Sequence, residues 1–415
     1  MKSKLLKPYT INNFITYGIL IVAFVIMQTL SSTGNLKSMT QGLLVPICMY
    51  IILAVSLNLT VGILGELSLG HAGFMCVGAY TSSIFSVVMQ NSIPESYIRF
   101  PIALLIGGIC AAIFGVLIGI PVLRLKGDYL AIVTLAFGEI IQNFAKSVYL
   151  GYDQNGVHAS LTSATVMGLD TVDGTLLING PQGIEGTPHD SNFVVGFILV
   201  FLTVVICLNF IHSRSGRAVM AIRDNRIAAE SIGINVTKYK LIAFALSAFL
   251  AGIAGVLYSH NLSILAASSK NFGYNMSIMI LVFVVLGGMG NIRGSIIAAT
   301  VLTVLPEVLR EVADYRMLIY ALALIIMMIF TSNDTLIGYR QRFFQSIKKI
   351  FAKNKKEAAD NVNAWAFLSA VFAPWTILTL KSKRVSFTAS SVPTAPEKPP
   401  FSTCSPEFTS PPTAQ

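Results

Sequence analysis

The chain has 415 residues, of which 54% are hydrophobic and only 12% are charged, and its formal net charge is +10. A soluble domain carries about a quarter charged residues, so this composition excludes an ordinary soluble protein and indicates an integral membrane protein in contact with lipid. The positive charge does not indicate nucleic-acid binding, because the cytoplasmic loops of multispanning proteins carry an excess of Lys and Arg anyway.

Apolar stretches of about 20 residues recur along the chain, as membrane-spanning helices require. The first follows Lys2, Lys4 and Lys7 but is not followed by a small-residue cleavage site, so we expect a retained span and not a signal peptide. The predicted fold is an all-α polytopic membrane protein with about ten transmembrane helices, at 14–30, 42–63, 67–89, 100–122, 129–150, 192–212, 241–263, 274–289, 295–312 and 316–331.

The Lys and Arg residues fall mainly in alternate connections between these stretches. If the N-terminus is cytoplasmic, the external connections hold only Lys37, Arg99 and Lys270. The longest external connection, 151–191, has no Lys or Arg and carries several acidic residues. This asymmetry predicts a multi-pass protein with a cytoplasmic N-terminus.

Glycine is concentrated at two places, one in each half of the chain: TVGILGELSLGHAGF and VLGGMGNIRGS. Two Gly-interrupted apolar segments in corresponding positions predict a two-half internal repeat and a site lined by broken or re-entrant helices. Close helix packing through small residues is the alternative. The candidate translocation-pathway residues in these motifs are Gly65, Ser68, Gly70, His71, Gly73, Gly287, Gly288 and Gly290.

Two polar residues in these apolar regions have competing interpretations. Glu139 lies about ten residues into the fifth stretch, which is near the bilayer midplane at about 1.5 Å per residue. With no basic partner at helical spacing, its carboxylate must pair with another helix or line a cavity, so we add it to the candidate pathway. His71 is more typical of a hydrogen-bonded residue at a helix end than of a ligand.

A polar, basic segment at 212–240, HSRSGRAVMAIRDNRIAAESIGINVTKYK, separates two apolar stretches. Its Ala-rich sequence forms a helix readily, and Arg217, Arg223 and Arg226 offer bidentate contacts to the carboxylates of a partner. The alternative is a solvated loop that is merely positively charged.

Motifs for ATP hydrolysis and for metal or hydrolase chemistry are missing from the sequence. There is no GxxxxGK[ST] phosphate loop, HExxH, GxSxG or cluster of His and Cys. We therefore expect no catalytic residues, no metal site and no ATPase site, so a partner must supply any energy for transport.

Four segments in this order resemble the permease subunits of branched-chain amino acid ABC transporters, in their LivM-like branch: SLNLTVGILGELSLGHAGFMCVGAY, LRLKGDYLAIVTLAFGEI, AIRDNRIAAESIGINVTKYKLIAFALSAFLAGIAGVLY and VLGGMGNIRGS. The resemblance implies a subunit in a bacterial cell membrane. It also implies a sister permease, two cytosolic ATP-binding cassette subunits and an extracytoplasmic substrate-binding protein as partners.

The implied activity is import of leucine, isoleucine and valine, with ATP used by the partner subunits and no cofactor bound by this chain. Relatives that carry urea or short amides are an alternative for the substrate. An ion-gradient-driven secondary transporter is the alternative from another class, although the sequence offers it only the isolated acid Glu139. A membrane-bound enzyme lacks a catalytic constellation.

The resemblance further implies that 212–240 contains a cytoplasmic coupling helix, whose family core is E-A-A-x-x-x-G. This sequence keeps the two alanines and the glycine but has Ile227 at the Glu position, with an acidic residue three positions later. The residues expected to contact the ATPase are Arg217, Arg223, Arg226, Ala228, Ala229, Glu230 and Gly233.

The expected domains are a transmembrane permease domain at 1–340 and a tail at 341–415. The first contains the coupling loop 212–240 and the external loop 151–191. The tail starts as a basic cytoplasmic end and becomes Ser/Thr/Pro-rich, a composition that cannot bury enough apolar surface to fold. Its apolar stretch 364–380 contains Pro374, so we expect an interfacial segment or an extension foreign to the family instead of an eleventh span.

Overall fold

The computed structural model describes residues 8–33, 38–124, 128–153, 156–162, 175–309, 321–322 and 325. The chain divides into two compact units, Met1–Trp375 and Thr376–Gln415. The second unit, and with it the expectations for the tail at 341–415, lies outside the described residues.

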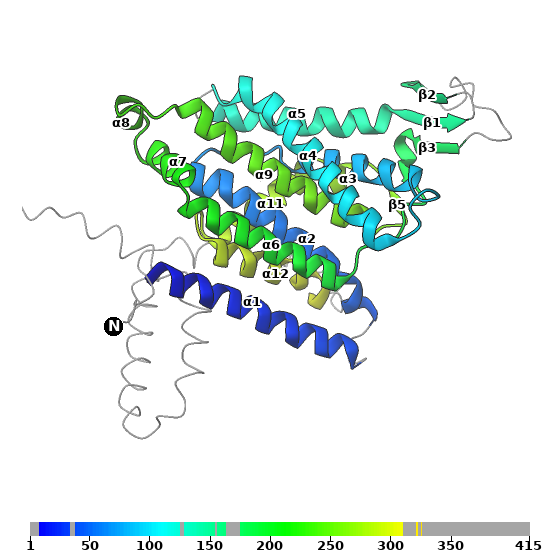
Figure 1. The fold of residues 1–415 in the computed structure, drawn as a ribbon, viewed down its shortest axis with the longest axis horizontal. Coiled ribbons are helices and arrows are strands. Elements are labelled where there is room, and N and C mark those ends of the chain that lie inside the picture. Colours follow the sequence, from blue (N-terminus) through cyan, green and yellow to red (C-terminus); the bar gives the residue numbers. More distant parts are fainter. Residues whose placement is uncertain are drawn as a thin grey trace, which may run out of the picture. The chain divides into compact units, whose positions relative to one another are not determined.

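Helices make up most of the first unit (Figure 1). Three short helices lie between the long ones: α7 (Arg214–Asp224), α8 (Arg226–Ser231) and α10 (Ser269–Phe272). The long helices are α1 (Pro8–Ser32), α2 (Ser38–Asn58), α3 (His71–Val88), α4 (Ser96–Val122), α5 (Asp128–Ser147), α6 (Phe193–His212), α9 (Val236–Ser259), α11 (Tyr274–Gly287) and α12 (Ile292–Val308).

Six helical stretches among the described residues are long and apolar enough to cross a membrane, and each overlaps a predicted span. Three further predicted spans correspond to α1, α5 and α12, which are not among these six. The tenth, 316–331, lies almost wholly outside the described residues. The protein is therefore a helical polytopic membrane protein. The six stretches are Gln41–Leu64, His71–Val88, Ser96–Val122, Phe193–His212, Val236–Ser259 and Ser269–Gly287.

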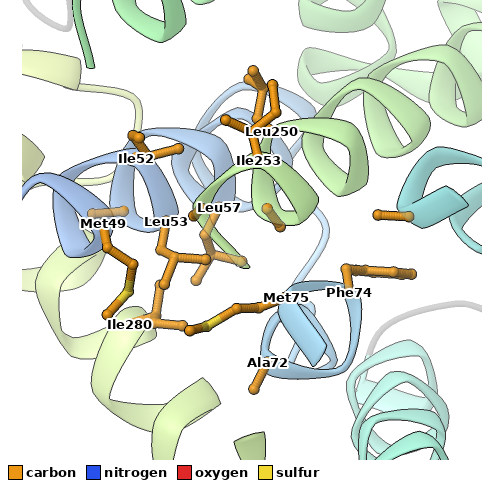
Figure 2. Packing of buried hydrophobic residues seen from close by; sticks show 14 of the residues in the cluster. Met49, Ile52, Leu53, Leu57, Ala72, Phe74, Met75, Leu250, Ile253 and Ile280 are labelled. Carbon is orange, nitrogen blue, oxygen red and sulfur yellow. The ribbon is translucent and has the colours of Figure 1, made fainter. Parts of the chain in front are cut away.

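Helix α2 lies at the centre of the packing. In the most apolar window of each helix, 89% of Gln41–Leu64 is buried, compared with 33% of α6. Figure 2 shows aliphatic side chains of α2 facing those of three neighbouring helices. The labelled residues are Met49, Ile52, Leu53 and Leu57 of α2, Ala72, Phe74 and Met75 of α3, Leu250 and Ile253 of α9, and Ile280 of α11.

Glycines bring α3, α4 and α9 into backbone contact. An added Cβ at Gly107 of α4 would lie 2.8 Å from the carbonyl oxygen of Gly78 in α3, and one at Gly252 of α9 would lie 2.9 Å from the carbonyl oxygen of Gly107. No side chain fits at such separations, so these helices pack through small residues. Close packing thus accounts for Gly78, Gly107 and Gly252.

The connection before α6 contains short strands, which the all-α prediction missed. β1 (Tyr149–Asp153) pairs in antiparallel fashion with β2 (Gly156–Ser160) and β3 (Thr175–Asn179). β4 (Ile184–Glu185) pairs with β5 (Ile264–Leu265). This connection and α7 lie at opposite ends of α6 (Figure 1), a helix of 20 residues that spans about 30 Å.

Candidate translocation and coupling site

The first glycine-rich motif contains a helix break. Helix α2 continues into a π-helix, η1 (Leu59–Leu64), which ends at Gly65 with φ 79°. This left-handed conformation is one that glycine adopts without strain. Residues 65–70 are not helical, and α3 begins at His71. The predicted break between the second and third spans is therefore present.

The second motif contains a shorter break, between the end of α11 and the start of α12. Gly288 and Gly290 have φ of 90° and 81°. An added Cβ at Gly287 would lie 2.5 Å from the Cα of Ser295, so the two helices approach closely just beyond the break. The predicted interruption at these glycines is also present.

The two breaks meet, although they are more than 200 residues apart in the sequence. The side-chain amide of Asn58 donates to Ser295 Oγ at 2.9 Å, and the backbone N–H of Gly290 donates to Asn58 Oδ1 at 2.7 Å. Asn58 and Ser295 are both fully buried. Gly62 packs so closely on the Gly290 backbone that no Cβ would fit between them. The structure joins the two motifs, while the two-half repeat stays a prediction.

The other candidate pathway residues of the first motif lie around the start of α3. His71 is buried and its Nε2 lies 2.7 Å from Ser56 Oγ, which fits the interpretation as a hydrogen-bonded helix-end residue. Gly70 packs on the backbone of Thr134, and an added Cβ at Gly73 would lie 2.8 Å from the Cα of Gly138 in α5. Ser68 is buried and its hydroxyl has no hydrogen-bond partner among the described residues.

Glu139 pairs across helices, which was one of its two predicted options. Its Oε1 accepts a hydrogen bond of 2.7 Å from the backbone N–H of Tyr274, the first residue of α11. A carboxylate at a helix N-terminus satisfies an otherwise unpaired N–H and interacts favourably with the helix dipole. Glu139 therefore caps α11 and lies at the opposite end of that helix from the break at Gly288.

The loop 212–240 folds into α7 and α8 because short polar side chains cap its helices. Ser213 Oγ accepts from the N–H of Gly216, and Asn225 Oδ1 accepts from that of Ala228. Asn235 caps α9 in the same way. Capping by Ser and Asn stabilises helix starts by about 1 kcal/mol each. Sequence reasoning predicted the helical character of the loop but not these caps.

The three arginines of the predicted coupling surface have partners within the chain. Arg217 donates to the carbonyl oxygen of His212, and Arg226 pairs with Glu230 at 3.0 Å, one helical turn away. Arg223 pairs with the neighbouring Asp224 at 3.0 Å. Bidentate contacts from these arginines to an ATPase stay a prediction.

The small residues of the predicted coupling core differ in exposure. Ala229 is only 2% exposed and packs with Ile222 and Val236, so it faces its own chain, whereas Ala228 faces solvent. Gly233 has φ 85° and open space around the position of a Cβ. Its conformation, and not crowding within this chain, accounts for glycine there.

Sequence reasoning missed two residues of this loop. Ile227 is 80% exposed and Ile232 is 75% exposed, at the two ends of the Ala-rich helix α8. The sequence does not single them out, because the loop also contains Val219, Ile222 and Val236, which are buried. The sequence alone could not predict that these two isoleucines are exposed, because Ala229, which lies between them in the chain, is buried.

Helix α7 also packs directly against the first break. Val219 is fully buried in a cluster with Leu59, Ile63 and Leu64 of η1. The loop therefore contacts the helix break that meets the second break. Within the described residues, no three His, Cys, Asp or Glu side chains lie together in a way that could hold a metal ion.

Membrane-length helices, two breaks that meet and a polar loop packed on one of them define a polytopic membrane protein of the transporter type. The chain belongs to the family described as branched-chain amino acid transport system / permease component, which matches residues 39–331.

Its relatives include the high-affinity branched-chain amino acid transport system permease protein LivM of Escherichia coli, which is 35% identical over 296 residues, 69% of this chain and 67% of the relative. LivH of the same description from Salmonella typhimurium is 24% identical over 61% of this chain and 80% of the relative. The fructose import permease protein FruG of Bifidobacterium longum is 25% identical over 69% of this chain and 80% of the relative. No solved structure matches the chain.

Proposed function

We propose that the chain is the transmembrane permease subunit of an ATP-driven importer that translocates leucine, isoleucine and valine. An extracytoplasmic binding protein delivers the substrate, a sister permease completes the membrane part, and two cytosolic ATP-binding cassette subunits hydrolyse ATP. Family membership and the likeness to LivM support this proposal. The likeness to LivH, a second permease by its description, supports a sister permease of the same family.

The observation that carries the proposal is the loop that packs on the first break with one side and exposes isoleucines on the other. Ile227 and Ile232 flank the exposed Ala228, with Arg226 and Glu230 beside them. Large aliphatic residues rimmed by charges mark a protein interface when they are exposed together. We assign this surface to the ATPase, and the joined breaks, from Gly65 to Gly73 and from Gly287 to Gly290, to the translocation pathway.

Replacement of Ile227 by Asp tests the interface. A buried, unpaired charge in an interface costs several kcal/mol, so we expect loss of ATPase association and of leucine uptake in proteoliposomes. Thr237→Asp is the matched control, because it adds the same charge at an exposed position near the start of α9, where a carboxylate is favourable. Equal association of both variants with the ATPase would contradict the assignment.

The proposal includes a topology of ten spans in a bacterial cell membrane, with the N-terminus in the cytoplasm. Cysteines placed at the exposed positions Thr175 and Asn235 test it, in a chain from which Cys404 has been removed. We expect a membrane-impermeant thiol reagent to label position 175 only from outside and position 235 only from inside. Labelling of both from one side would refute the span count between them.

The energy source and the substrate are tested with the purified complex in proteoliposomes. We expect leucine uptake that needs ATP and the binding protein and that persists when ion gradients are abolished. Uptake that collapses with the gradients would identify a secondary transporter. Competition by urea or acetamide, but not by isoleucine or valine, would identify the short-amide alternative.

A further inference from the structure

The guanidinium group of Arg223 contacts the first helix break. Its Nη1 donates a hydrogen bond of 3.0 Å to the carbonyl oxygen of Gly62 in η1. Its aliphatic stem lies over Gly65, where an added Cβ would come within 2.6 Å of Arg223 Cγ. The other edge of the guanidinium group contacts Asp224 Oδ1, which accepts hydrogen bonds from Nε at 3.2 Å and from Nη2 at 3.0 Å. Arg223 is thus held against the break by its stem and Nη1, while 38% of its side chain stays exposed to solvent.

This contact provides a hydrogen-bond donor for a carbonyl group at the C-terminal end of η1. The last carbonyl groups of a helix have no partner within it, and a cation placed there is favoured by the helix dipole. The carbonyl of Thr60 is satisfied by the N–H groups of Gly65 and Glu66, and the carbonyl of Gly62 by Arg223. A residue of α7 therefore completes the C-terminus of η1.

A second contact joins the break to the far end of the same loop. Glu66, the residue after Gly65, forms an ion pair with Lys240 near the start of α9, and the two side chains are 17% and 7% exposed. The loop 212–240 therefore contacts the start of the break at two points, through Arg223 in the last turn of α7 and through Lys240 in the second turn of α9.

On its other side, η1 contacts the second break. Gly62, whose carbonyl accepts from Arg223, packs directly on the backbone of Gly290. Asn58, one residue before η1, hydrogen-bonds both Gly290 and Ser295. These contacts form a continuous chain from α7, through Arg223 and Gly62, to the junction of the two breaks.

We propose that Arg223 is a positioning residue that transmits movement of the coupling loop to the broken helices, and that it does not contact the ATPase. The inference rests on the proposed function and assigns one of the residues expected at the ATPase surface to a different task. Arg226, Ile227 and Ile232 remain at that surface.

The experiment compares Arg223→Met with Lys238→Met in the complex reconstituted with its sister permease, ATPase subunits and binding protein. Methionine keeps an aliphatic stem over Gly65 but removes the donors, whereas Lys238 is exposed, lies in the same loop and is no part of the contact. We expect Arg223→Met to keep its ATPase subunits and its hydrolysis rate while leucine imported per ATP falls about tenfold, the effect of a lost charged hydrogen bond. Arg223→Lys restores one hydrogen-bond donor and should recover part of the leucine imported per ATP.

A second measurement on the purified permease needs no partner. Hydrogen exchange of the amides at 59–66 should rise about tenfold in Arg223→Met and stay unchanged in Lys238→Met, because the free break opens more often. Unchanged exchange, unchanged import per ATP, or loss of the ATPase subunits from the variant would each overturn the inference. If the wild-type complex itself shows no ATP-driven uptake, the proposed function fails, and the exchange measurement still decides the role of Arg223.

Discussion

The two ends of the helix bundle each contain a largely buried ion pair, but the pairs join different kinds of structure. At the end near the strands, Arg99 in the first turn of α4 pairs at 2.8 Å with Asp190, which lies shortly before α6, and the side chains are 4% and 5% exposed. At the other end, Glu66 and Lys240 join a helix break to the loop 212–240, the proposed coupling loop. We call these the outer pair and the inner pair.

The two ion pairs also differ in the structures that surround them. The outer pair is supported by Ser96, which donates to Asp190 at 2.5 Å, and it holds the starts of two continuous helices in place. The inner pair lies next to Gly65, whose φ of 79° only glycine adopts readily. It also lies next to the non-helical residues 65–70. The outer pair therefore joins two continuous helices, whereas the inner pair fixes the position of a non-helical segment.

The largest effect is expected when the outer pair is broken. Arg99→Met leaves Asp190 buried without its cation, which costs about 3–5 kcal/mol, so the thermal midpoint of the purified protein should fall sharply. Leucine uptake per folded complex should stay near that of wild type. In Arg99→Met/Asp190→Leu, both charges are gone and much of the stability should return. If the thermal midpoint of Arg99→Met equals that of wild type, the outer pair does not stabilise the fold.

A smaller effect is expected where the two breaks touch. Gly62→Ala places a methyl group against the backbone of Gly290, which costs about 1–3 kcal/mol and displaces the junction, so uptake should be lost with moderate loss of stability. Gly42→Ala, in helix α2, which continues into η1, meets open space and serves as the control. Uptake by Gly62→Ala equal to that of Gly42→Ala would show that the junction tolerates separation.

Two glycines with the same backbone strain test the two ends directly. Gly233 in the coupling loop and Gly186 near the strands have φ of 85° and 76°, and neither has an atom within 4 Å of an added Cβ. Alanine at either position should cost about 1–2 kcal/mol. Thermal midpoints should therefore fall equally, but only Gly233→Ala should reduce ATP-driven uptake. A matching loss of uptake in Gly186→Ala would contradict the assignment of coupling to one end.

The smallest effect is expected on truncation after Lys356. The residues of both ion pairs and both breaks lie before position 300, and the composition of the remainder is that of a chain without its own core. Expression, assembly and uptake should stay close to those of the full chain. Loss of assembly would mean that 364–380 packs against the permease.

The sequence allowed prediction of those features that depend on local chemistry. Apolar runs located the helices, and glycine clusters located both breaks, because few other residues adopt φ near 80°. It did not show that the breaks meet or that Glu139 caps α11, since these are contacts between distant segments. The strands at 149–185 were missed because they are short and their pairing is also a tertiary contact. Arg223 was assigned to the ATPase surface from its charge, and its hydrogen bond to Gly62 is again a contact between distant segments that the sequence does not display.

The π-helical geometry of η1 makes the number of residues in this segment as important as their identity. In a π-helix each hydrogen bond spans five residues instead of four, so each turn of η1 contains more residues than a turn of α-helix. Each residue added to or removed from an α-helix turns everything beyond it by about 100°. Deletion of one residue between 59 and 64 would therefore favour a regular α-helix and swing Gly65 and Glu66 away from the coupling loop. A single-residue gap at this segment in an otherwise similar permease would mark a protein whose break is held in another way.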